Sequence, residues 1–365
     1  MNKQSKHTPA PRVLRVIAHI GLLRPTTVPD QGMRLLEKLC SSRHTIAAVL
    51  LYKNDPLWPE AARMGFSVIA MPPELAGPRK KIHAALEHNE PFNQRFTRWR
   101  KRVAALHADI GLVFYGSWLP PALYEIPSEG FINYHPAPLP ELRGMEPDTL
   151  AILEGRRAIW GTVHRVTRNY DEGAILERSA RLRISPHDTP LSLFARLSAA
   201  GIPALMRALN NIAAGKAKPL TPHTRTASQA TRRMAREASW IQWASDNHDI
   251  IHRRLRAFNG QHIGIRLKAW IGEQPYILDD LELVRGRFPG KPGDVLGQYR
   301  GRGAFSKAAV VRTQEGVAVA RLGIPWSTNA DHLPEPRALC LLEAIRRKPR
   351  INKRLLSSSF TGKDR

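Results

Sequence analysis

Short apolar segments separated by helical stretches constrain the fold of this chain more than any other feature. Each segment has the length of a strand and the dense aliphatic composition of a parallel strand buried on both faces. Between them, apolar residues recur with helical spacing, as in Gly32–Leu39 and over 77–108. This alternation predicts βαβ units in a doubly wound α/β sheet. The predicted strands are Val13–Ile20, Thr45–Tyr52, Ser67–Met71, Ile110–Tyr115 and Gly130–His135.

The alternation fades after about residue 185, and a second pattern follows. Leu191–Ile212 is amphipathic and predicts a long closing helix, and residues 215–236 are rich in Pro, Thr, Ser and Arg, which indicates an exposed connector. A helix over Asp249–Phe258 and five short strand-like segments then predict a small antiparallel barrel or sandwich. We therefore expect a catalytic domain over 12–214, a linker over 215–236, a second domain over 237–325 and a loosely ordered basic tail over 326–365. The strand-like segments are Ile265–Ile271, Tyr276–Val284, Asp294–Gln298, Ala308–Arg312 and Val317–Leu322.

Composition excludes several classes of protein. Cys40 and Cys340 are the only cysteines, so neither a disulfide framework nor a cysteine zinc site is expected. The 14 histidines are scattered without ligand spacing, and we predict no metal site. No apolar run reaches the roughly 18 residues of a membrane helix, and no apolar stretch typical of a signal peptide follows the polar start. We expect a cytoplasmic protein with no membrane partner.

The net charge of +25 leaves two interpretations open. A basic chain gains affinity for nucleic acid by displacing phosphate counterions, but an arginine-rich solvated surface has the same composition. The excess is concentrated toward the end of the chain, since residues 201–365 hold 29 Lys and Arg against 13 Asp and Glu. Charge alone does not decide between these interpretations.

Residues able to carry out chemistry are densest between Asn133 and Asp171. Asn133 and His135 are two apart on a predicted strand, so their side chains leave the same face at the end of the strand where α/β sheets place their sites. Asp171 lies in an Asn-Tyr-Asp-Glu-Gly turn that can bring a carboxylate back to the histidine. A neutral amide beside an imidazole oriented by a carboxylate suits acyl transfer. Taken singly, each residue also fits a capped or ordinary turn, and no nucleophile elbow or phosphate-binding loop accompanies them.

Taken together, these residues resemble the folate-dependent formyltransferase family. That family has Asn-x-His, a proline-containing loop, Arg-Gly, Ala-Ile on a helix and Asp-x-Gly in this order, preceded by a loop that shapes the pterin pocket. The matching residues are Asn133 and His135, Pro138-Leu139-Pro140, Arg143-Gly144, Ala151-Ile152, Asp171-Glu172-Gly173 and, upstream, Tyr115-Gly116 with Leu119-Pro120.

The resemblance implies transfer of a formyl group from 10-formyltetrahydrofolate to a primary amine, without a metal. It implies that Asn133 and His135 stabilise the tetrahedral intermediate and that Asp171 orients or charges His135. The folate would lie against Tyr115, Gly116 and the loop Ala137, Pro138, Leu139 and Pro140. The implied fold is a Rossmann-like domain followed by a small OB-like barrel.

The identity of the formyl acceptor depends on the rest of the chain. Trp240–Trp243, Arg256–Asn259 and Pro292–Leu296 are similar to landmarks of the C-terminal domain of methionyl-tRNA formyltransferases, whose layout this chain resembles most. With the basic C-terminal half, they favour a tRNA acceptor. Two departures favour a small amine instead, such as a nucleotide-linked amino sugar or an amino-acid derivative. Ala137 stands where the family usually has Ser, and the segment after Tyr52 lacks the long basic loop of the tRNA enzymes. An inert RNA-binding protein is the alternative of another class.

Overall fold

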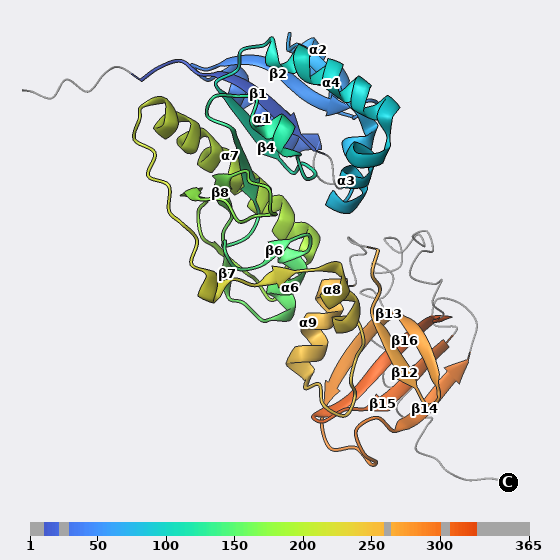
Figure 1. Ribbon diagram of the computed structural model, residues 1–365. Helices are drawn as coiled ribbons and strands as arrows, with labels where there is room; N and C mark the ends of the chain where they lie inside the picture. Colours follow the sequence, from blue (N-terminus) through green and yellow to red (C-terminus); the bar gives the residue numbers. More distant parts are fainter. Residues whose placement is uncertain (1–10, 22–28, 259–263, 301–306, 327–365) are drawn as a thin grey trace, which may run out of the picture. The chain divides into compact units, whose positions relative to one another are not determined.

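The computed structural model describes residues 11–21, 29–258, 264–300 and 307–326 (Figure 1). These residues form two compact units. The first comprises the described residues of Met1–Asp148, Arg157–Ile184 and Ser192–Ala230, and the second those of Thr149–Arg156, Ser185–Leu191 and Thr231–Arg365. Each unit is described by itself below. The predicted tail over 326–365 lies outside the described residues from 327 onward.

A seven-stranded sheet forms the centre of the first unit. Its order is β3-β2-β1-β4-β5-β8-β9, and the first five strands in that order are parallel. The last two run antiparallel to their neighbours. The predicted doubly wound, Rossmann-like α/β sheet is therefore confirmed, with an antiparallel edge that was not predicted. The strands are β1 (Arg15–Ile20), β2 (Thr45–Tyr52), β3 (Val68–Met71), β4 (Ile110–Phe114), β5 (Phe131–His135), β8 (Thr162–Arg165) and β9 (Ile175–Arg178).

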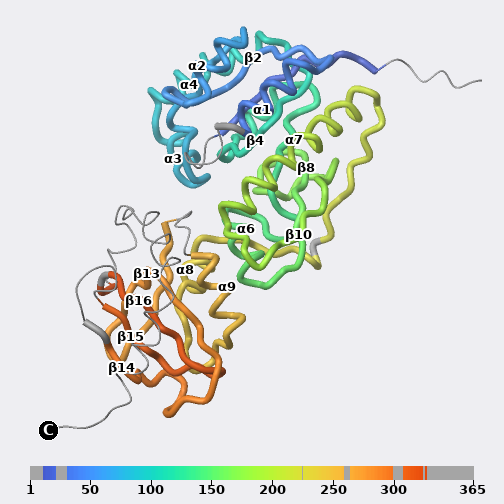
Figure 2. Tube along the Cα trace, turned by 180° about the vertical axis from the view of Figure 1, so that it is seen from behind, coloured from blue at the N-terminus to red at the C-terminus, as the bar shows by residue number. Residues whose placement is uncertain are grey.

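Two hydrophobic clusters cover the two faces of this sheet, as the continuous apolar strands require. Within β1, Val16 and Ala18 pack in one cluster, and Ile17 packs in the other. The first cluster takes the apolar sides of α1 and α7, and the second takes those of α3 and α4. Figure 2 shows these helices on either side of the strands. The helical segments of this unit are α1 (Pro29–Cys40), α2 (Trp58–Arg63), η1 (Pro73–Leu75), α3 (Arg79–His88), α4 (Glu90–Ala104), α5 (Pro121–Tyr124) and most of α7 (Pro190–Ala213). The short helix α6 (Pro147–Leu153) belongs mostly to the second unit.

Two short strand pairs fix the loops around the sheet. β7 (Ala158–Ile159) pairs with β10 (Leu182–Arg183), and β6 (Arg143–Gly144) pairs in parallel with β11 (Gln229–Ala230). The segment 215–236, expected as an exposed connector, thus contains β11, the 3₁₀ turn η2 (Thr224–Thr226) and the start of a helix. Part of it is packed because Ser228 accepts from Arg143 N–H at 2.9 Å through its carbonyl and from Leu142 N–H at 2.9 Å through its hydroxyl.

An antiparallel sheet dominates the second unit. Its order is β12-β13-β16-β15-β14, with every neighbouring pair antiparallel, as the short strand-like segments predicted. Among the described residues, no helix is both long and apolar enough to cross a membrane. The elements of this unit are α8 (Arg232–Ala238), α9 (His248–Phe258), β12 (Lys268–Ile271), β13 (Gln274–Arg285), β14 (Val295–Arg300), β15 (Lys307–Arg312) and β16 (Gly316–Pro325).

Candidate active site

Asn133 and His135 lie at the carboxyl end of β5, where the sheet changes from parallel to antiparallel pairing. Their separation of two residues places both side chains on one side of the strand. The antiparallel neighbour β8 sets His164 directly opposite Asn133, with the Asn133 Nδ2 and His164 Nε2 atoms 3.1 Å apart. Asn133 is half-buried, whereas the His135 and His164 side chains are 6% and 3% exposed. The amide is therefore the member of this group that lies nearest to solvent.

Asp171 joins these residues from a turn far along the chain. Its backbone adopts a left-handed conformation, with φ of 54°, which Asp tolerates better than most residues. The Asp171 Oδ2 atom accepts from Gly144 N–H at 3.0 Å and lies 3.6 Å from His135 Nδ1. The Oδ1 atom lies 3.5 Å from His164 Nε2. The turn thus brings one carboxylate between two histidines, and the sequence-predicted residues Asn133, His135 and Asp171 form a single cluster.

The partners of each ring nitrogen indicate where protons reside. His164 Nδ1 lies 2.9 Å from the Arg165 carbonyl oxygen, so this nitrogen carries a hydrogen. His164 Nε2 lies 3.1 Å from the Asn133 amide nitrogen and 3.5 Å from Asp171 Oδ1, so it accepts from Asn133 when the ring is neutral and donates to Asp171 when the ring is charged. In the neutral form the Asn133 amide nitrogen keeps a second hydrogen to donate. His135 Nε2 faces the Leu142 carbonyl oxygen at 3.1 Å while its Nδ1 faces Asp171. Because both nitrogens of His135 face acceptors, the imidazolium is the form that can donate to both.

The carboxylate of Asp171 is ionised in this setting. Burial alone would raise its pKa, but the positive charge of the His135 ring, the His164 ring and the Gly144 N–H together lower the pKa of Asp171 to about 2. A buried carboxylate held in its charged form next to two imidazoles provides a fixed negative charge in the site. Such a charge can stabilise an imidazolium or attract a proton leaving an attacking amine.

His164 is the member of the cluster that sequence reasoning missed. Thr162 and His164 alternate on β8, but this strand is only four residues long and lies outside the parallel series. The sequence signal that could have located His164 was the pattern Gly161-Thr162-Val163-His164, which is typical of a strand that follows a glycine. Its position opposite Asn133 depends on antiparallel pairing with β5, which the sequence does not reveal.

The loop after His135 is held by a single hydroxyl from the neighbouring strand. Thr162 Oγ1 donates to the Ala137 carbonyl at 2.7 Å and accepts from Leu139 N–H at 3.2 Å. Ala137, Pro138 and Leu139 are buried, and Pro140 is half-buried. The predicted folate loop therefore has a fixed backbone directly after the strand that carries Asn133.

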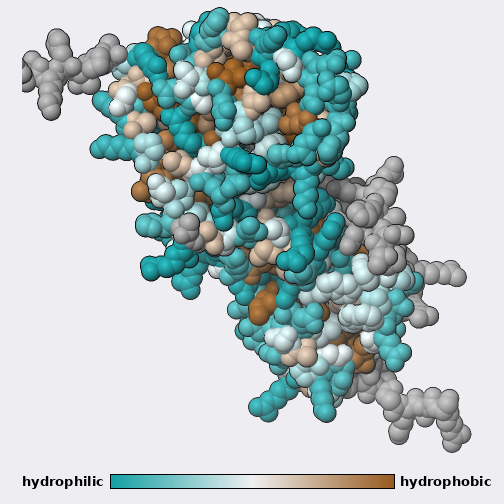
Figure 3. Space-filling view, in the orientation of Figure 1, coloured by the Kyte–Doolittle hydropathy of each residue, from teal (hydrophilic) through white to brown (hydrophobic). Residues whose placement is uncertain are grey.

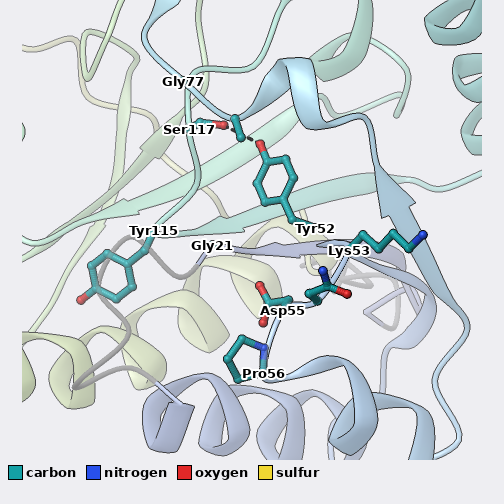
Figure 4. A pocket seen from close by; sticks show the side chains of 10 residues that line it. Gly21, Tyr52, Lys53, Asp55, Pro56, Gly77, Tyr115 and Ser117 are labelled. Atoms are coloured by element: carbon teal, nitrogen blue, oxygen red, sulfur yellow. Dashed lines mark hydrogen bonds between the residues drawn. The ribbon is translucent and has the colours of Figure 1, made fainter.

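A cavity of about 350 Å³ opens at the same carboxyl edge of the sheet, beside the other strands (Figure 4). Of the predicted folate residues, Tyr115 lines it, with φ of 61° and its hydroxyl 2.5 Å from Ser198 Oγ. Gly116 follows, and a Cβ there would lie 2.5 Å from Val113 Cγ1, so a side chain at this position would clash. The other lining residues are Gly21, Tyr52, Lys53, Asn54, Asp55, Pro56, Ala76, Gly77 and Ser117. Among the residues described, no group of three or more His, Cys, Asp or Glu is placed to hold a metal.

The start of α3 holds the turn that carries Asp171. The Arg79 backbone N–H donates to the Tyr170 hydroxyl at 3.0 Å, and its guanidinium donates to Asn169 Oδ1 at 3.1 Å. The same guanidinium lies 5.6 Å from the centre of the Trp118 ring, and Trp118 Nε1 donates to the Arg168 carbonyl at 2.9 Å. Arg79 is thus a positioning residue for the turn rather than part of a free basic surface.

We expect Arg79→Ala to lower kcat about three- to tenfold, because Asp171 would lose part of its support while the cluster itself stays intact. Steady-state kinetics would check this, with Arg79→Lys as a partial rescue and Lys80→Ala, which changes an exposed neighbour, as the control. Equal kcat values for Arg79→Ala and Lys80→Ala would contradict the positioning role.

Comparison with known proteins identifies the family. Residues 30–209 match the family model described as formyl transferase. The methionyl-tRNA formyltransferase of Methylacidiphilum infernorum (isolate V4) is 30% identical over 270 residues, which cover 73% of this chain and 80% of that protein. The chain belongs to the formyl transferase family. Its segment that matches the family model contains Asn133, His135, His164 and Asp171.

Further relatives agree with this family assignment. The methionyl-tRNA formyltransferase of Pseudoalteromonas translucida (strain TAC 125) is 31% identical over 242 residues, covering 63% of this chain and 68% of that one. The N-formyltransferase from Helicobacter canadensis has the same fold, with a TM-score of 0.54, 15% identity and coverage of 86% of this chain and 100% of that one. HypX from Aquifex aeolicus in complex with tetrahydrofolic acid gives a TM-score of 0.51 at 16% identity and covers 85% of this chain. The match covers 44% of HypX, so this chain corresponds to less than half of the length of HypX.

Proposed function

We propose that this formyltransferase moves the formyl group of 10-formyltetrahydrofolate to the primary amine of methionyl-tRNA. The observation that carries the proposal is the buried cluster of an amide, two imidazoles and one carboxylate at the end of β5, in a chain of the formyl transferase family. Two solved structures with this fold were determined with tetrahydrofolic acid or with folinic acid and dTDP-3-aminofucose, which supports a folate donor.

The chemistry follows from the positions of the side chains. The acceptor nitrogen bonds to the formyl carbon, and the bond from that carbon to N10 of the folate then breaks. In the tetrahedral intermediate the formyl oxygen carries negative charge, to which the free amide hydrogen of Asn133 can donate. The imidazolium of His135 supplies a positive charge nearby. One proton passes from the amine to N10, and the Asp171 carboxylate assists it by attracting that proton and stabilising His135.

The proposed folate site lies at the carboxyl ends of the neighbouring strands β4 and β5. Tyr115 and Gly116 follow β4, and the loop Ala137–Pro140 follows β5, its hydrogen-bonded neighbour. The loop backbone is fixed by Thr162, so the loop needs no further ordering to line a ligand. Residues 12–214 are the proposed catalytic domain.

The choice of methionyl-tRNA as the acceptor rests on the relatives and on the second unit. Both relatives named above are methionyl-tRNA formyltransferases that share about 30% of their residues with this chain. We propose that the five antiparallel strands of the domain 237–325 form an OB-like barrel, a fold that binds oligonucleotides in many proteins. The positive charge of residues 201–365 suits a phosphate backbone.

A small amine is the second candidate acceptor, and two observations favour it. Only Lys53–Leu57 separate β2 from α2, so no long loop is available there to reach a large substrate. The sugar N-formyltransferase structures also match this fold over nearly their whole length. An amino sugar linked to a nucleotide is the acceptor class that these observations support.

Transfer of label from 10-formyltetrahydrofolate separates the two acceptors. With the formyl carbon labelled, we expect methionyl-tRNA to take up label, with a KM that rises steeply between about 50 and 200 mM salt because phosphate contacts release counterions. The comparison is a panel of nucleotide-linked amino sugars under the same conditions. Label in the sugars and none in methionyl-tRNA would overturn the choice of acceptor and leave the formyl transfer itself established.

A further inference from the structure

We infer that the outer face of α4 binds an RNA phosphate backbone, and we call Arg98, Lys101 and Arg102 the α4 basic face. The inference rests on the proposed function, because the RNA is the acceptor proposed above. It concerns a surface of the first unit that neither the catalytic cluster nor the cavity includes.

The apolar side of α4 leaves these three cations in solvent. Phe92, Phe96, Trp99 and Val103 are buried in the hydrophobic cluster on one side of the sheet, and Trp99 Nε1 donates to the Ala70 carbonyl at 2.7 Å. The spacing of three and four residues between these anchors fixes the rotation of the helix. The residues of the α4 basic face are therefore held outward and are all exposed. Hydrophilic side chains cover the surface over α4 in the space-filling view (Figure 3).

The charges of this face are not balanced by the protein. Arg95, one turn earlier, pairs with Glu74. Within the described part of the chain, none of the three residues of the α4 basic face has an ion-pair partner, and residues 97–108 contain no Asp or Glu.

The helical spacing places these positive charges next to one another. Arg98 lies three residues before Lys101 and four before Arg102, positions that are adjacent on a helix surface and repel when both are positive. Lys101 and Arg102 in the last turn also interact favourably with the helix dipole, which accounts for these two cations but not for Arg98. A polyanion that covers this face would relieve the repulsion.

The residue types of α4 indicate which class of polyanion binds the α4 basic face. An interfacial membrane helix inserts an apolar side into the lipid, but the apolar side of α4 is already buried in the core. No aromatic side chain of α4 is exposed, so stacking on unpaired bases is not available. Arg and Lys without aromatic residues make sequence-independent contacts to phosphate, and such contacts position a nucleic acid without reading it.

The face is remote from the reacting atoms. Trp99 of α4 donates to the carbonyl of Ala70 in β3, and β3 is four strand intervals from β5, which is about 19 Å at the usual spacing between strands. Loss of the α4 basic face should therefore weaken RNA binding and raise KM for an RNA acceptor while kcat stays unchanged.

A neutralised variant tests the inference in the full-length protein. In Arg98→Gln, Lys101→Gln, Arg102→Gln, we expect tRNA affinity at about 50 mM salt to fall at least about tenfold, and the slope of log affinity against log salt to fall by about 2. The matched control is Arg34→Gln, Lys38→Gln, Arg43→Gln, which removes three exposed cations, two within α1 and one shortly after its end. Both variants carry the same net charge, so a difference between them reports position rather than overall charge.

Direct RNA binding and formyl transfer are measured in parallel, which keeps this inference separate from the proposed function. If methionyl-tRNA is formylated and the two triple variants bind it equally, the inference is overturned and the proposed function stands. If no methionyl-tRNA is formylated but tRNA binding weakens only in the α4 variant, the α4 basic face is supported and the acceptor is wrong. Wild-type protein that binds anionic lipid vesicles through α4, and binds no tRNA, would overturn the inference in favour of a membrane.

Discussion

Replacing Asn133 by alanine is expected to lower kcat about 10²–10³-fold, because one donor to a developing oxyanion contributes about that much. The effect should fall on kcat rather than on KM, since the amide donates to a charge that is absent from the bound substrate. His135→Ala should lower kcat by at least the same factor, because it removes the imidazole that supplies the positive charge and that lies next to the Asp171 carboxylate.

The fold should survive the Asn133 change, since this side chain is half-buried and packs at the end of a strand whose backbone pairs on both sides. Asn210→Ala is the matched control, because the Asn210 amide oxygen also contacts a histidine ring nitrogen, that of His44 at 3.2 Å, on an exposed part of α7. Steady-state kinetics and circular dichroism of both variants check the expectation. Turnover near that of wild type in both Asn133→Ala and His135→Ala would remove this cluster from the mechanism.

Changing Asp171 to asparagine is expected to affect both turnover and the pH dependence of stability. The uncharged side chain keeps the size of the carboxylate and can still accept from Gly144 N–H, but it no longer balances the His135 imidazolium. We expect kcat to fall about 100-fold, the lower range for loss of a group that assists proton transfer.

The stability effect has a defined sign. Asp171 has its pKa lowered in the folded state, from 3.8 to about 2, so ionisation of Asp171 stabilises the fold above pH 4. This contribution is about 2 kcal/mol at pH 7, is about halved near pH 3, and vanishes as the pH falls through 2. Urea unfolding of wild type and Asp171→Asn at pH 7 and pH 3 measures the difference at each pH.

Glu172→Gln is the control for Asp171, because it changes the adjacent carboxylate. The Glu172 side chain is 43% exposed and pairs with Arg143 at 2.6 Å on the surface. It should leave kcat within a few-fold of wild type and shift stability little at either pH. A stability difference for Asp171→Asn that is the same at pH 3 and pH 7 would show that the carboxylate is not held ionised by its neighbours.

The parallel core of the fold could be predicted because each strand is buried on both faces. Thr45–Tyr52 is a continuous apolar run, and its bounds are those of β2. The same logic located Asn133 and His135 at the end of β5, since residues two apart on a strand share a side. Prediction failed where pairing rather than burial decides the structure. β8 is short and lies at an antiparallel edge, so neither its partner nor the place of His164 opposite Asn133 follows from periodicity.

The pairing of residues 228–230 with the rest of the chain could not be predicted, for a related reason. Ser228 and Ala230 look like linker residues in sequence, and only their hydrogen bonds to the loop 140–145 show that they are part of the structure around the site. Small and polar residues carry little periodic signal, although their backbone groups pair as strongly as those of apolar residues. The turn that carries Asp171 could be predicted from its residues, but the hydrogen bond from Gly144 N–H to the Asp171 carboxylate could not.

The pairing of β6 with β11 gives the proposed catalytic domain, residues 12–214, backbone partners from beyond its last long helix. A fragment stopping at residue 214 would contain the whole cluster yet leave the backbone of Leu142, Arg143 and Met145 without its partners from Ser228 and Ala230. Gly144, which donates to Asp171, lies in the middle of that stretch. Any gene fusion or transplantation of this formyltransferase domain therefore has to carry the chain through Ala230, because the strand that completes the site is encoded after the apparent end of the domain.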